Sequence, residues 1–572
     1  MKRIFSYLIP FRLRMAMGFC IKVAGTLAEL FLPVILNHIL KNVVARESVG
    51  DILLWGAVML LFAILACALN IIANRMAAYV GRRFSEALRH DLFSATLSLD
   101  AAAADAFTVP SLESRITTDT YHVHNFIMMI QRMGVRAPIL LLGGVIITLC
   151  MDAALALVIL AVMPFIFVTV YVLSRLGTRL FARVQRSVDG MVRVVREDFG
   201  GIRVIKALSR EQHEINRFEN ANQQLSKNEQ TASFAMSGTH PVMTLLMNCG
   251  IAAVVAIAAL RVDAGTSSAE TVLAFMQYFT LISMSLMAVS RMFVMYSKCS
   301  ASARRIAEVL DTPPALTLSP RTEERRCEHL IEFRDVSFAY AGKNNTLSHI
   351  SFSLPRGGSL GIIGGTGCGK STLLRLLLRF YDATEGEILF RGQPITAISR
   401  EEIARDVGVA HQKDFLFAGT IAQNVRFERA LSDDEVWTAL KIAQAEAFVS
   451  ALPDGIETPL ATGGTNLSGG QRQRLLLARA VAGAPALLLL DDATSALDYK
   501  TDAAFRAALS ALPRGTTTVT VAQRVSSVMH CDRILVLHEG RMLGYGSHEA
   551  LLATCPLYKE ISDSQMGGAL FE

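Results

Sequence analysis

Long apolar runs dominate the first half of the chain. A helix that crosses a bilayer needs about 20 predominantly apolar residues. Six stretches reach that length, at roughly 16–39, 52–78, 126–150, 153–173, 236–260 and 272–294. Polar side chains interrupt the third and sixth stretches, at Gln131, Arg132, Arg136 and Arg291. The pattern therefore predicts six membrane-spanning helices.

The connections between these stretches alternate between short and long. Residues 41–50, 151–152 and 261–268 are brief, whereas 80–125 and 175–235 are long and charged. Arginine and lysine gather before the first stretch and in both long connections. Because basic loops stay on the cytoplasmic side of a membrane, we expect both termini to be cytoplasmic. The expected location is the plasma membrane, which is the inner membrane in a bacterium.

The long connections carry helical patterns of their own. Apolar residues recur at helical spacing through 82–99, and no glycine or proline interrupts them. Twenty further helical residues would extend about 30 Å beyond the bilayer. Ala101 to Ala104 and the pair Gly200–Gly201 mark the expected turning points. We therefore expect membrane helices that continue far into the cytoplasm.

Composition supports a membrane class for the chain. Of its 572 residues, 52% are hydrophobic and only 19% are charged, which excludes a disordered or fibrous chain. The formal net charge of +6 is expected on cytoplasmic loops and not on a nucleic-acid-binding face. Nine cysteines are scattered without a C-x-x-C pair. That pattern excludes a disulfide framework or a zinc site as the organising principle.

A different pattern begins after Arg304–Arg305. Three prolines and clustered charges indicate a linker at 311–329. From residue 330, short β-rich runs alternate with helical stretches, and these runs are 331–333, 359–363, 487–490, 517–521 and 533–537. Alternation of this kind is typical of an α/β domain with a mainly parallel sheet. We therefore expect a membrane domain at 1–310 and a second domain at 330–572.

A glycine-rich motif lies near the start of the second domain. Residues 364–371 read GGTGCGKS and match G-x-x-x-x-G-K-[ST] between a strand and a helix. Backbone N–H groups of such a loop cradle phosphates, the lysine reaches the β- and γ-phosphates, and the serine hydroxyl holds Mg²⁺. The alternative is a glycine turn without a ligand. The predicted ATP-binding residues are Gly364, Gly365, Thr366, Gly367, Cys368, Gly369, Lys370, Ser371 and Thr372.

Two further motifs identify a family. The apolar run 487–490 ends in Asp491, a carboxylate placed to orient Mg²⁺. Ahead of it, Leu467, Ser468, Gly469, Gly470 and Gln471 read LSGGQ. Here the whole chain resembles the ATP-binding cassette (ABC) transporter family, in the form of an exporter-type half-transporter. The resemblance implies a six-span α-helical transmembrane domain followed by an α/β P-loop cassette, with ATP and Mg²⁺ as its cofactors.

The same resemblance assigns roles to other positions. It implies that Tyr340 stacks on adenine and that Gln412 meets Mg²⁺ and the membrane domain. It also implies that the LSGGQ residues and Asp498 act on ATP held by a second cassette, so that each site is shared across a dimer. Short coupling helices are expected at Ala101–Phe107 and Gly201–Ser209.

Two positions depart from the family pattern at the catalytic pair. Asp492 stands where the family has the glutamate that polarises water, and Gln523 stands where it has the switch histidine. Aspartate is one methylene shorter, and a misplacement of about 1 Å can cost about 10²-fold in rate. Glutamine cannot become cationic. Thr462 is a milder departure, since the family often has an acid there.

These departures predict a heterodimer with unequal sites. We expect this chain to hold ATP in a weakly hydrolytic site. We also expect its LSGGQ to complete the ATP site of a second ABC half-transporter chain. Alternatives are a homodimer that hydrolyses slowly with Asp492, a siderophore or metal-chelate importer of the same fold, and a regulatory subunit that senses nucleotide. We expect the lipid bilayer and a small amphipathic drug or lipid as further partners, and no nucleic acid.

For residues on the expected substrate path, the sequence leaves two interpretations open. Glu29 lies well inside the first span, where it recognises a cationic substrate or pairs with Lys22. Methionine and phenylalanine are frequent in the sixth span, where they either pack or form an adaptable ligand surface. These residues are Phe275, Met276, Phe279, Met284, Met287, Met292 and Met295, with Gln277 between them.

Overall fold

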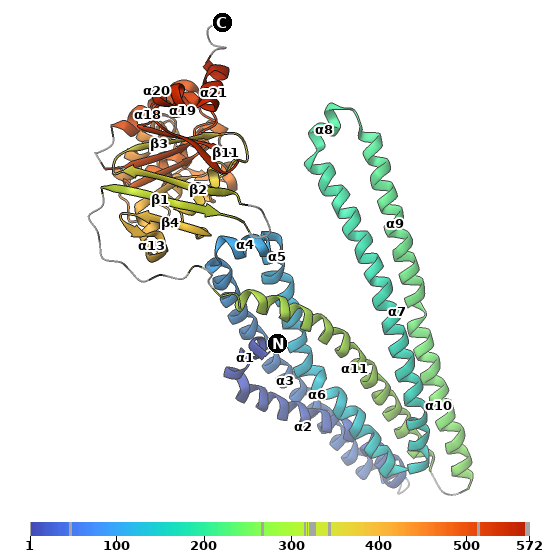
Figure 1. The fold of residues 1–572 in the computed structure, drawn as a ribbon. Helices are drawn as coiled ribbons and strands as arrows, with labels where there is room; N and C mark the ends of the chain where they lie inside the picture. The colour runs from blue at the N-terminus through green and yellow to red at the C-terminus, as the bar shows by residue number, and fades with distance from the viewer. Residues whose placement is uncertain are drawn as a thin grey trace. The chain divides into compact units, whose positions relative to one another are not determined.

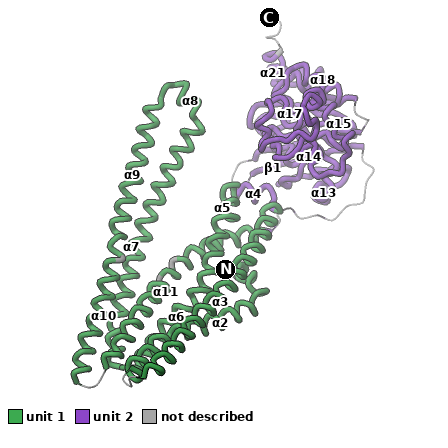
Figure 2. Tube along the Cα trace, turned by 180° about the vertical axis from the view of Figure 1, so that it is seen from behind, with its two compact units in different colours: residues 1–98, 107–312 green, residues 99–106, 313–572 purple. Residues whose placement is uncertain are grey.

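The computed structural model describes residues 2–44, 48–264, 268–313, 316, 319, 328–340, 345–511 and 515–566. The chain divides into two compact units. Unit 1 comprises 1–98 and 107–312, and unit 2 comprises 99–106 and 313–572, as Figure 2 shows in two colours. Most of the expected linker at 311–329 lies outside the described residues.

Every regular secondary-structure element among the described residues of unit 1 is a helix. Within them, six stretches are long and apolar enough to cross a membrane, which confirms the six predicted spans. The principal helices are α2 (Arg12–His38), α3 (Val49–Ser98), α6 (Thr120–Met151), α7 (Ala153–Gly200), α9 (Glu211–Ser237), α10 (Thr239–Asp263) and α11 (Ala269–Leu310). Shorter helices are α1 (Lys2–Ser6), α5 (Val109–Ser114) and α8 (Ile202–Ala207).

The long connections are helical, as the sequence predicted. The helix α3 runs for 50 residues without interruption, and α7 runs for 48 residues up to Gly200. Gly201 caps α7 and leads into α8, after which α9 returns alongside α7 (Figure 1). The glycine pair is therefore the turning point of the second long connection.

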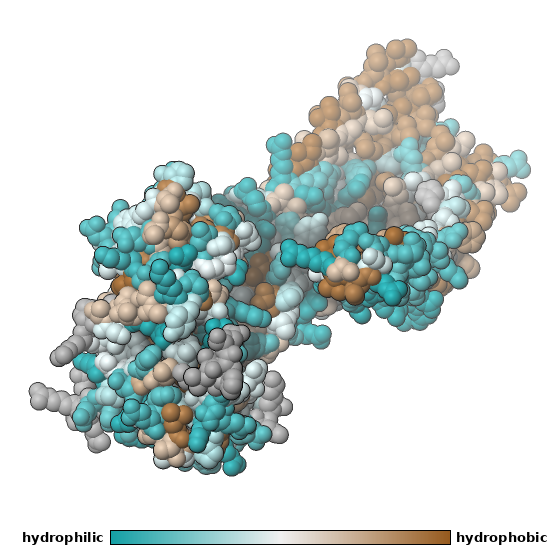
Figure 3. Space-filling model, turned by 90° about the horizontal axis from the view of Figure 1, so that it is seen from above, coloured by the Kyte–Doolittle hydropathy of each residue, from teal (hydrophilic) through white to brown (hydrophobic). Residues whose placement is uncertain are grey.

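Packing in unit 1 combines a small core with an apolar outer surface. Tyr278 and Phe279 of α11 are fully buried, and the Tyr278 hydroxyl donates a hydrogen bond to the Leu30 carbonyl at 2.5 Å. Phe275 is also buried in this core, so these aromatic residues of the sixth span pack. Large apolar side chains such as Leu53 and Leu60 are exposed on α3. Figure 3 shows hydrophobic residues gathered over the helical unit, as expected of helices that face lipid.

One expectation for the first span is wrong. Glu29 does not pair with Lys22. Its carboxylate accepts from Arg136 of α6, at 3.2 Å from Nε and 2.5 Å from Nη2. Lys22 donates instead to Asn70 and Asn74 of α3, at 2.7 and 3.1 Å. Seven residues along a helix correspond to about 10 Å, too far for a direct ion pair.

Unit 2 is built on a sheet in strand order β12-β11-β3-β10-β9-β6. The strands are β3 (Ser359–Gly364), β6 (Val407–Ala410), β9 (Leu487–Asp491), β10 (Thr517–Val521), β11 (Arg533–His538) and β12 (Arg541–Gly546). All neighbours are parallel except β11 and β12. The predicted β-rich runs therefore form an α/β domain, and the carboxyl ends of β3, β9 and β10 lie at one edge.

A second sheet and two groups of helices complete unit 2. The strands β1 (His329–Phe338), β2 (Leu347–Pro355), β4 (Glu385–Phe390) and β5 (Gln393–Pro394) form an antiparallel sheet, and β7 (Gly419–Thr420) pairs with β8 (Pro459–Leu460). The helices are α12 (Lys370–Leu377), α13 (Arg400–Asp406), α14 (Ile421–Arg426), α15 (Asp433–Ile442), α16 (Glu446–Ser450), α17 (Gly469–Val481), α18 (Tyr499–Ser510), α19 (Val525–Val528), α20 (His548–Thr554) and α21 (Pro556–Met566). Leu476 and Leu477 of α17 are buried in an apolar core that α14 and α15 share.

The short helix α4 (Ala101–Phe107) matches the first expected coupling helix. Its residues up to 106 belong to unit 2. The Tyr381 hydroxyl donates to Asp105 Oδ2 at 2.6 Å, and burial together with this bond raises the pKa of Tyr381 above its ordinary value. Ala101 and Ala104 line a groove of about 800 Å³ together with Phe380 and other residues of the α/β domain.

This contact predicts a measurable loss of order in α4. Replacing Asp105 with alanine removes the acceptor of the Tyr381 hydroxyl, so amide exchange across residues 101–106 should become faster. Hydrogen–deuterium exchange with mass spectrometry measures that rate, with α12 as an internal reference. Asp105→Asn keeps an acceptor oxygen and should stay close to wild type. Unchanged exchange in Asp105→Ala would mean that the bond does not hold α4.

Candidate active site

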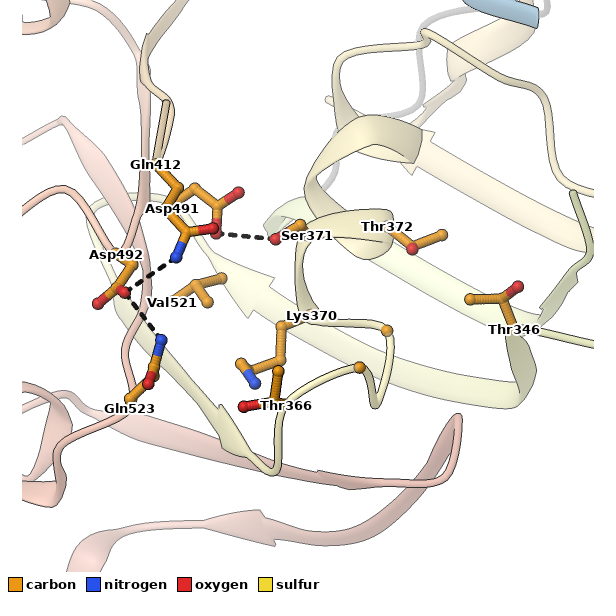
Figure 4. Close-up of a pocket in the computed structure, with 12 residues that line it drawn as sticks. Thr346, Thr366, Lys370, Ser371, Thr372, Gln412, Asp491, Asp492, Val521 and Gln523 are labelled. Atoms are coloured by element: carbon orange, nitrogen blue, oxygen red, sulfur yellow. Dashed lines mark hydrogen bonds between the residues drawn. The ribbon is translucent and has the colours of Figure 1, made fainter. Parts of the chain in front are cut away.

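A cleft of about 200 Å³ opens at the carboxyl ends of the central strands of unit 2. Figure 4 shows the side chains that line it. They come from the residue before β2, from the glycine-rich loop and α12, from the segment after β6, and from the ends of β9 and β10. The lining residues are Thr346, Thr366, Gly367, Gly369, Lys370, Ser371, Thr372, Gln412, Asp491, Asp492, Val521 and Gln523.

Close contact or a left-handed backbone requires glycine at three positions of the loop, Gly364, Gly367 (φ +81°) and Gly369. A Cβ atom on Gly364 would lie 2.0 Å from the Leu537 carbonyl oxygen. Gly369 has φ +102°, a left-handed conformation that glycine adopts at little cost, and caps the start of α12. At Gly365 and Gly367, an added Cβ would meet nothing within 4 Å. The outer side of the loop therefore faces open space, as a cradle for a phosphate chain does.

Lys370 folds back over this loop. Its ammonium group donates to the carbonyl oxygens of Gly364 and Gly365 at 2.8 and 2.7 Å. No side chain caps the first N–H groups of α12. The ammonium and the helix N-terminus together supply positive charge at the cleft, which suits an anion.

Two oxygen donors meet beside the lysine. The Ser371 hydroxyl lies 3.1 Å from Asp491 Oδ1, to which it donates a hydrogen bond. Asp491 ends β9 and is only 8% exposed. A hydroxyl and a carboxylate are oxygen ligands that Mg²⁺ prefers. The donor set and the open cradle therefore fit a magnesium nucleotide.

The carboxylate of Asp492 is held by two amides. Its Oδ2 accepts from Gln523 Nε2 at 3.0 Å and from Gln412 Nε2 at 3.4 Å (Figure 4). The backbone of Asp492 has φ +51°, and its N–H donates to the Val521 carbonyl. Burial raises the pKa of Asp492 above its ordinary value, and the charge of Asp491 raises it further. The two amides and Lys370 act in the opposite direction.

Tyr340 lies next to α12 and not among the residues that line the cleft. Its hydroxyl is 3.2 Å from Thr372 Oγ1 and accepts from Arg375 at 3.0 Å. Its ring meets that of Tyr381 edge to face, with centroids 5.2 Å apart. Gly364, Gly365 and Cys368 belong to the loop but are not among the residues that line the cleft, and Cys368 is buried.

The LSGGQ residues are separate from this cleft, since none of residues 467–471 lines it. Ser468 caps α17 by accepting from the Gln471 N–H at 3.3 Å, and the Gln471 side chain accepts from the Ser468 N–H at 2.9 Å. Asp498 caps α18 in a similar way through Thr501, and these bonds lower the pKa of Asp498. Both motifs are therefore preformed helix N-termini outside this chain's own cleft.

Gln565 is a residue that the sequence analysis missed. It lies at the end of α21, and its side-chain amide forms two hydrogen bonds with the backbone of the segment after β10. Its Oε1 accepts from the Val525 N–H at 2.8 Å, and its Nε2 donates to the Gln523 carbonyl at 3.0 Å. Thr346 and Val521 also line the cleft unpredicted. No motif marks these three residues, because packing alone brings them to the site.

Comparison with known proteins gives consistent results along the chain. Residues 15–286 match the family described as ABC transporter transmembrane region, and residues 347–495 match the family described as ABC transporter. The uncharacterised ABC transporter ATP-binding protein Rv1273c of Mycobacterium tuberculosis is 34% identical over 98% of this chain and 97% of its own length. YfiB of Bacillus subtilis, also an uncharacterised ABC transporter ATP-binding protein, is 33% identical over 99% of each.

A solved structure shares the fold. A bacterial Atm1-family ABC exporter with ATP bound superposes with a TM-score of 0.81 at 24% identity. The superposition covers 97% of this chain and 98% of that chain.

The paired oxygen donors predict a dependence on magnesium. Ser371→Ala removes the hydroxyl beside Asp491, so Mg²⁺ should no longer strengthen nucleotide binding. We expect the gain in affinity on adding Mg²⁺ to fall by about tenfold or more, the effect typical of an altered metal site. Titration with a fluorescent ATP analogue, with Mg²⁺ or with EDTA, measures the change. Ser371→Thr keeps a hydroxyl and serves as the matched control. An unchanged response to Mg²⁺ in Ser371→Ala would contradict the assignment.

Proposed function

The chain belongs to the ABC transporter family, and from that premise we propose that it is one subunit of a heterodimeric exporter of amphipathic small molecules. The family binds ATP, and the six apolar helices make this chain a multi-pass membrane protein. In the proposal, both termini and the cassette at 330–572 are cytoplasmic, and the membrane is the plasma or bacterial inner membrane.

The residues of the cleft take distinct parts in holding the nucleotide. The N–H groups of the glycine-rich loop and the Lys370 ammonium bind the phosphates, and Tyr340 supports the base. Ser371, Gln412 and Asp491 provide oxygens for Mg²⁺. When bound, magnesium nucleotide supplies the phosphoryl group that is hydrolysed. The side chains position it and balance its charge.

The geometry around Asp492 carries the proposal of unequal sites. Its carboxylate is short and is held by the amides of Gln412 and Gln523. A base that polarises water must reach that water, and a tethered aspartate falls about 1 Å short of a glutamate at the same position. The neutral Gln523 cannot supply positive charge to the phosphates. Both features favour retention of ATP over its hydrolysis.

In contrast to the catalytic pair, the LSGGQ motif keeps all of the family's residues. Ser468 caps α17 through the Gln471 N–H, and the first N–H groups of the helix, at Gly469 and Gly470, are suited to bind an anion from outside the chain. In the proposal, they close over ATP held by a second half-transporter chain that carries the catalytic glutamate and histidine. Hydrolysis at that site then drives the cycle.

Coupling to the membrane follows from the helical extensions. In the proposal, closure of the two cassettes is transmitted through α4 and α8 to the spans, which open outward. Asp105 and Tyr381 hold α4 on its own cassette, so its position follows that of the cassette.

Two substitutions test the shared sites. Lys370→Ala should abolish nucleotide binding at this chain's site but preserve most turnover of the assembled transporter. Ser468→Ala should lower turnover by about tenfold or more, because it removes a group that stabilises charge at the partner's ATP. Steady-state ATPase activity of the co-purified complex measures both. If Lys370→Ala abolished turnover, or if Ser468→Ala were the milder change, the two sites would not be divided as proposed.

Restoring the family residues tests the weak site directly. The double variant Asp492→Glu with Gln523→His should raise ATP hydrolysis at this site by about tenfold to 10²-fold, since it recovers the reach of the base. The measurement is ATPase activity in a complex whose partner site is inactivated. Each single variant serves as a control. Brisk hydrolysis by the unaltered chain alone would instead indicate an active homodimer.

A further inference from the structure

Three basic side chains gather inside the membrane-spanning part of unit 1. Lys22 of α2 and Arg132 of α6 both contact Asn74 of α3. Lys22 also lies within electrostatic range of Arg136, of Glu29 and of Arg132. We call Lys22, Arg132 and Arg136 the basic cluster. The helices α2, α3 and α6 pack against one another around it. Lys22 is 4% exposed, so its ammonium is enclosed by these helices.

Internal partners neutralise only one of the three charges. Glu29 forms a two-point ion pair with Arg136. Neither Lys22 nor Arg132 has a carboxylate within ion-pair distance among the described residues. Lys22 donates to the neutral side-chain oxygens of Asn70 and Asn74.

Arg132 makes fewer hydrogen bonds than Lys22. It makes one long contact, 3.5 Å, with the Asn74 carbonyl oxygen, and its Nε is buried without a hydrogen-bond partner. An uncompensated charge in a low-dielectric region is unfavourable, because it loses the solvation that water provides. Ionisable residues inside membranes therefore mark a substrate or ion path by default. The basic cluster has the charge and the free donor of a site for an anion.

An apolar cavity lies beside the cluster. Its volume is about 480 Å³, within the range of sites for small organic ligands. Glu29 lines it and, through its bond to Arg136, joins it to the basic cluster. The other lining residues are Leu32, Pro33, Ile251, Met276, Gln277, Thr280 and Leu281. Gln277 and Thr280 are polar, and the remaining residues are apolar.

We propose that the transmembrane unit binds an amphiphile with an anionic head group, its charge on Lys22 and Arg132 and its apolar body in the cavity beside Glu29. A carboxylate or a phosphate on an apolar chain has this chemistry. Glu29 then acts as an internal anion that keeps Arg136 in place. This inference deepens the proposed function by naming the substrate class, and it reverses the expectation that Glu29 selects a cation.

The test compares two probes that differ only in charge. Dansyl-aminoundecanoic acid and its methyl ester are titrated, by fluorescence, into the complete transporter in phosphatidylcholine nanodiscs without nucleotide. The acid should bind about tenfold more tightly than the ester, which corresponds to about 1.4 kcal/mol. Equal affinities, or tighter binding of the ester, would overturn the proposal.

Substitutions test whether the basic cluster causes the tighter binding of the acid probe. Lys22→Met and Arg132→Met should each remove most of the preference for the acid and leave ester binding unchanged. Arg132→Lys keeps the charge and should keep the preference. Arg75→Met is the matched control, because Arg75 follows Asn74 on α3 but is exposed. If the methionine variants weakened both probes equally, the cluster would be structural and the proposal would fail. If a methionine variant does not assemble, as judged by gel filtration, the wild-type probe pair still decides.

Competition distinguishes an amphiphile from a simple anion. Dodecyl phosphate should displace the acid probe, whereas inorganic phosphate at the same concentration should not. Equal displacement by both would mean that the cavity does not bind the apolar chain, and it would overturn the proposal of an amphiphile. Binding is measured without hydrolysis, so these results do not depend on the asymmetry of the ATP sites. Failure of the ATPase predictions would leave the anion site standing, and the reverse also holds.

Discussion

Parallel hydrogen bonding between β3, β10 and β9 is the constraint on which the nucleotide cleft depends. Asp491 pairs with Val521, and Val521 in turn pairs with Ile362. This register places the ends of three strands at one edge of the sheet. The loop after β3, the carboxylates after β9 and the glutamine after β10 are distant in sequence and meet only because of it. A slip of one residue would turn each side chain away from the cleft.

The sequence could predict elements whose signal is local. Runs of apolar residues identified the six spans, and the uninterrupted helical pattern after the second span identified the extension of α3. The glycine-rich loop was recognisable because strand, glycines and lysine follow one another within a few residues. Each of these inferences rests on the periodicity of a single element.

Features that depend on packing between distant segments could not be predicted. Glu29 and Arg136 are 107 residues apart, and only the packing of α2 on α6 brings them together. Lys22 is nearer to Glu29 in the sequence and lies on the same helix, but the axial rise of that helix keeps the two side chains apart. Gln565 illustrates the same point, since its amide reaches Gln523 from the last described helix. Polar residues of this kind have no spacing rule that reveals their partners.

The uninterrupted length of α3 has a mechanical consequence. At 1.5 Å per residue, 50 residues form a rod of about 75 Å. A tilt of about 5° at one end displaces the other end by about 6.5 Å, more than a helical turn. No proline hinge interrupts the rod between Val49 and Ser98, and the helix continues through Gly50, Gly56 and Gly81. A small angular change at the tip next to α4 is therefore amplified along a stiff lever.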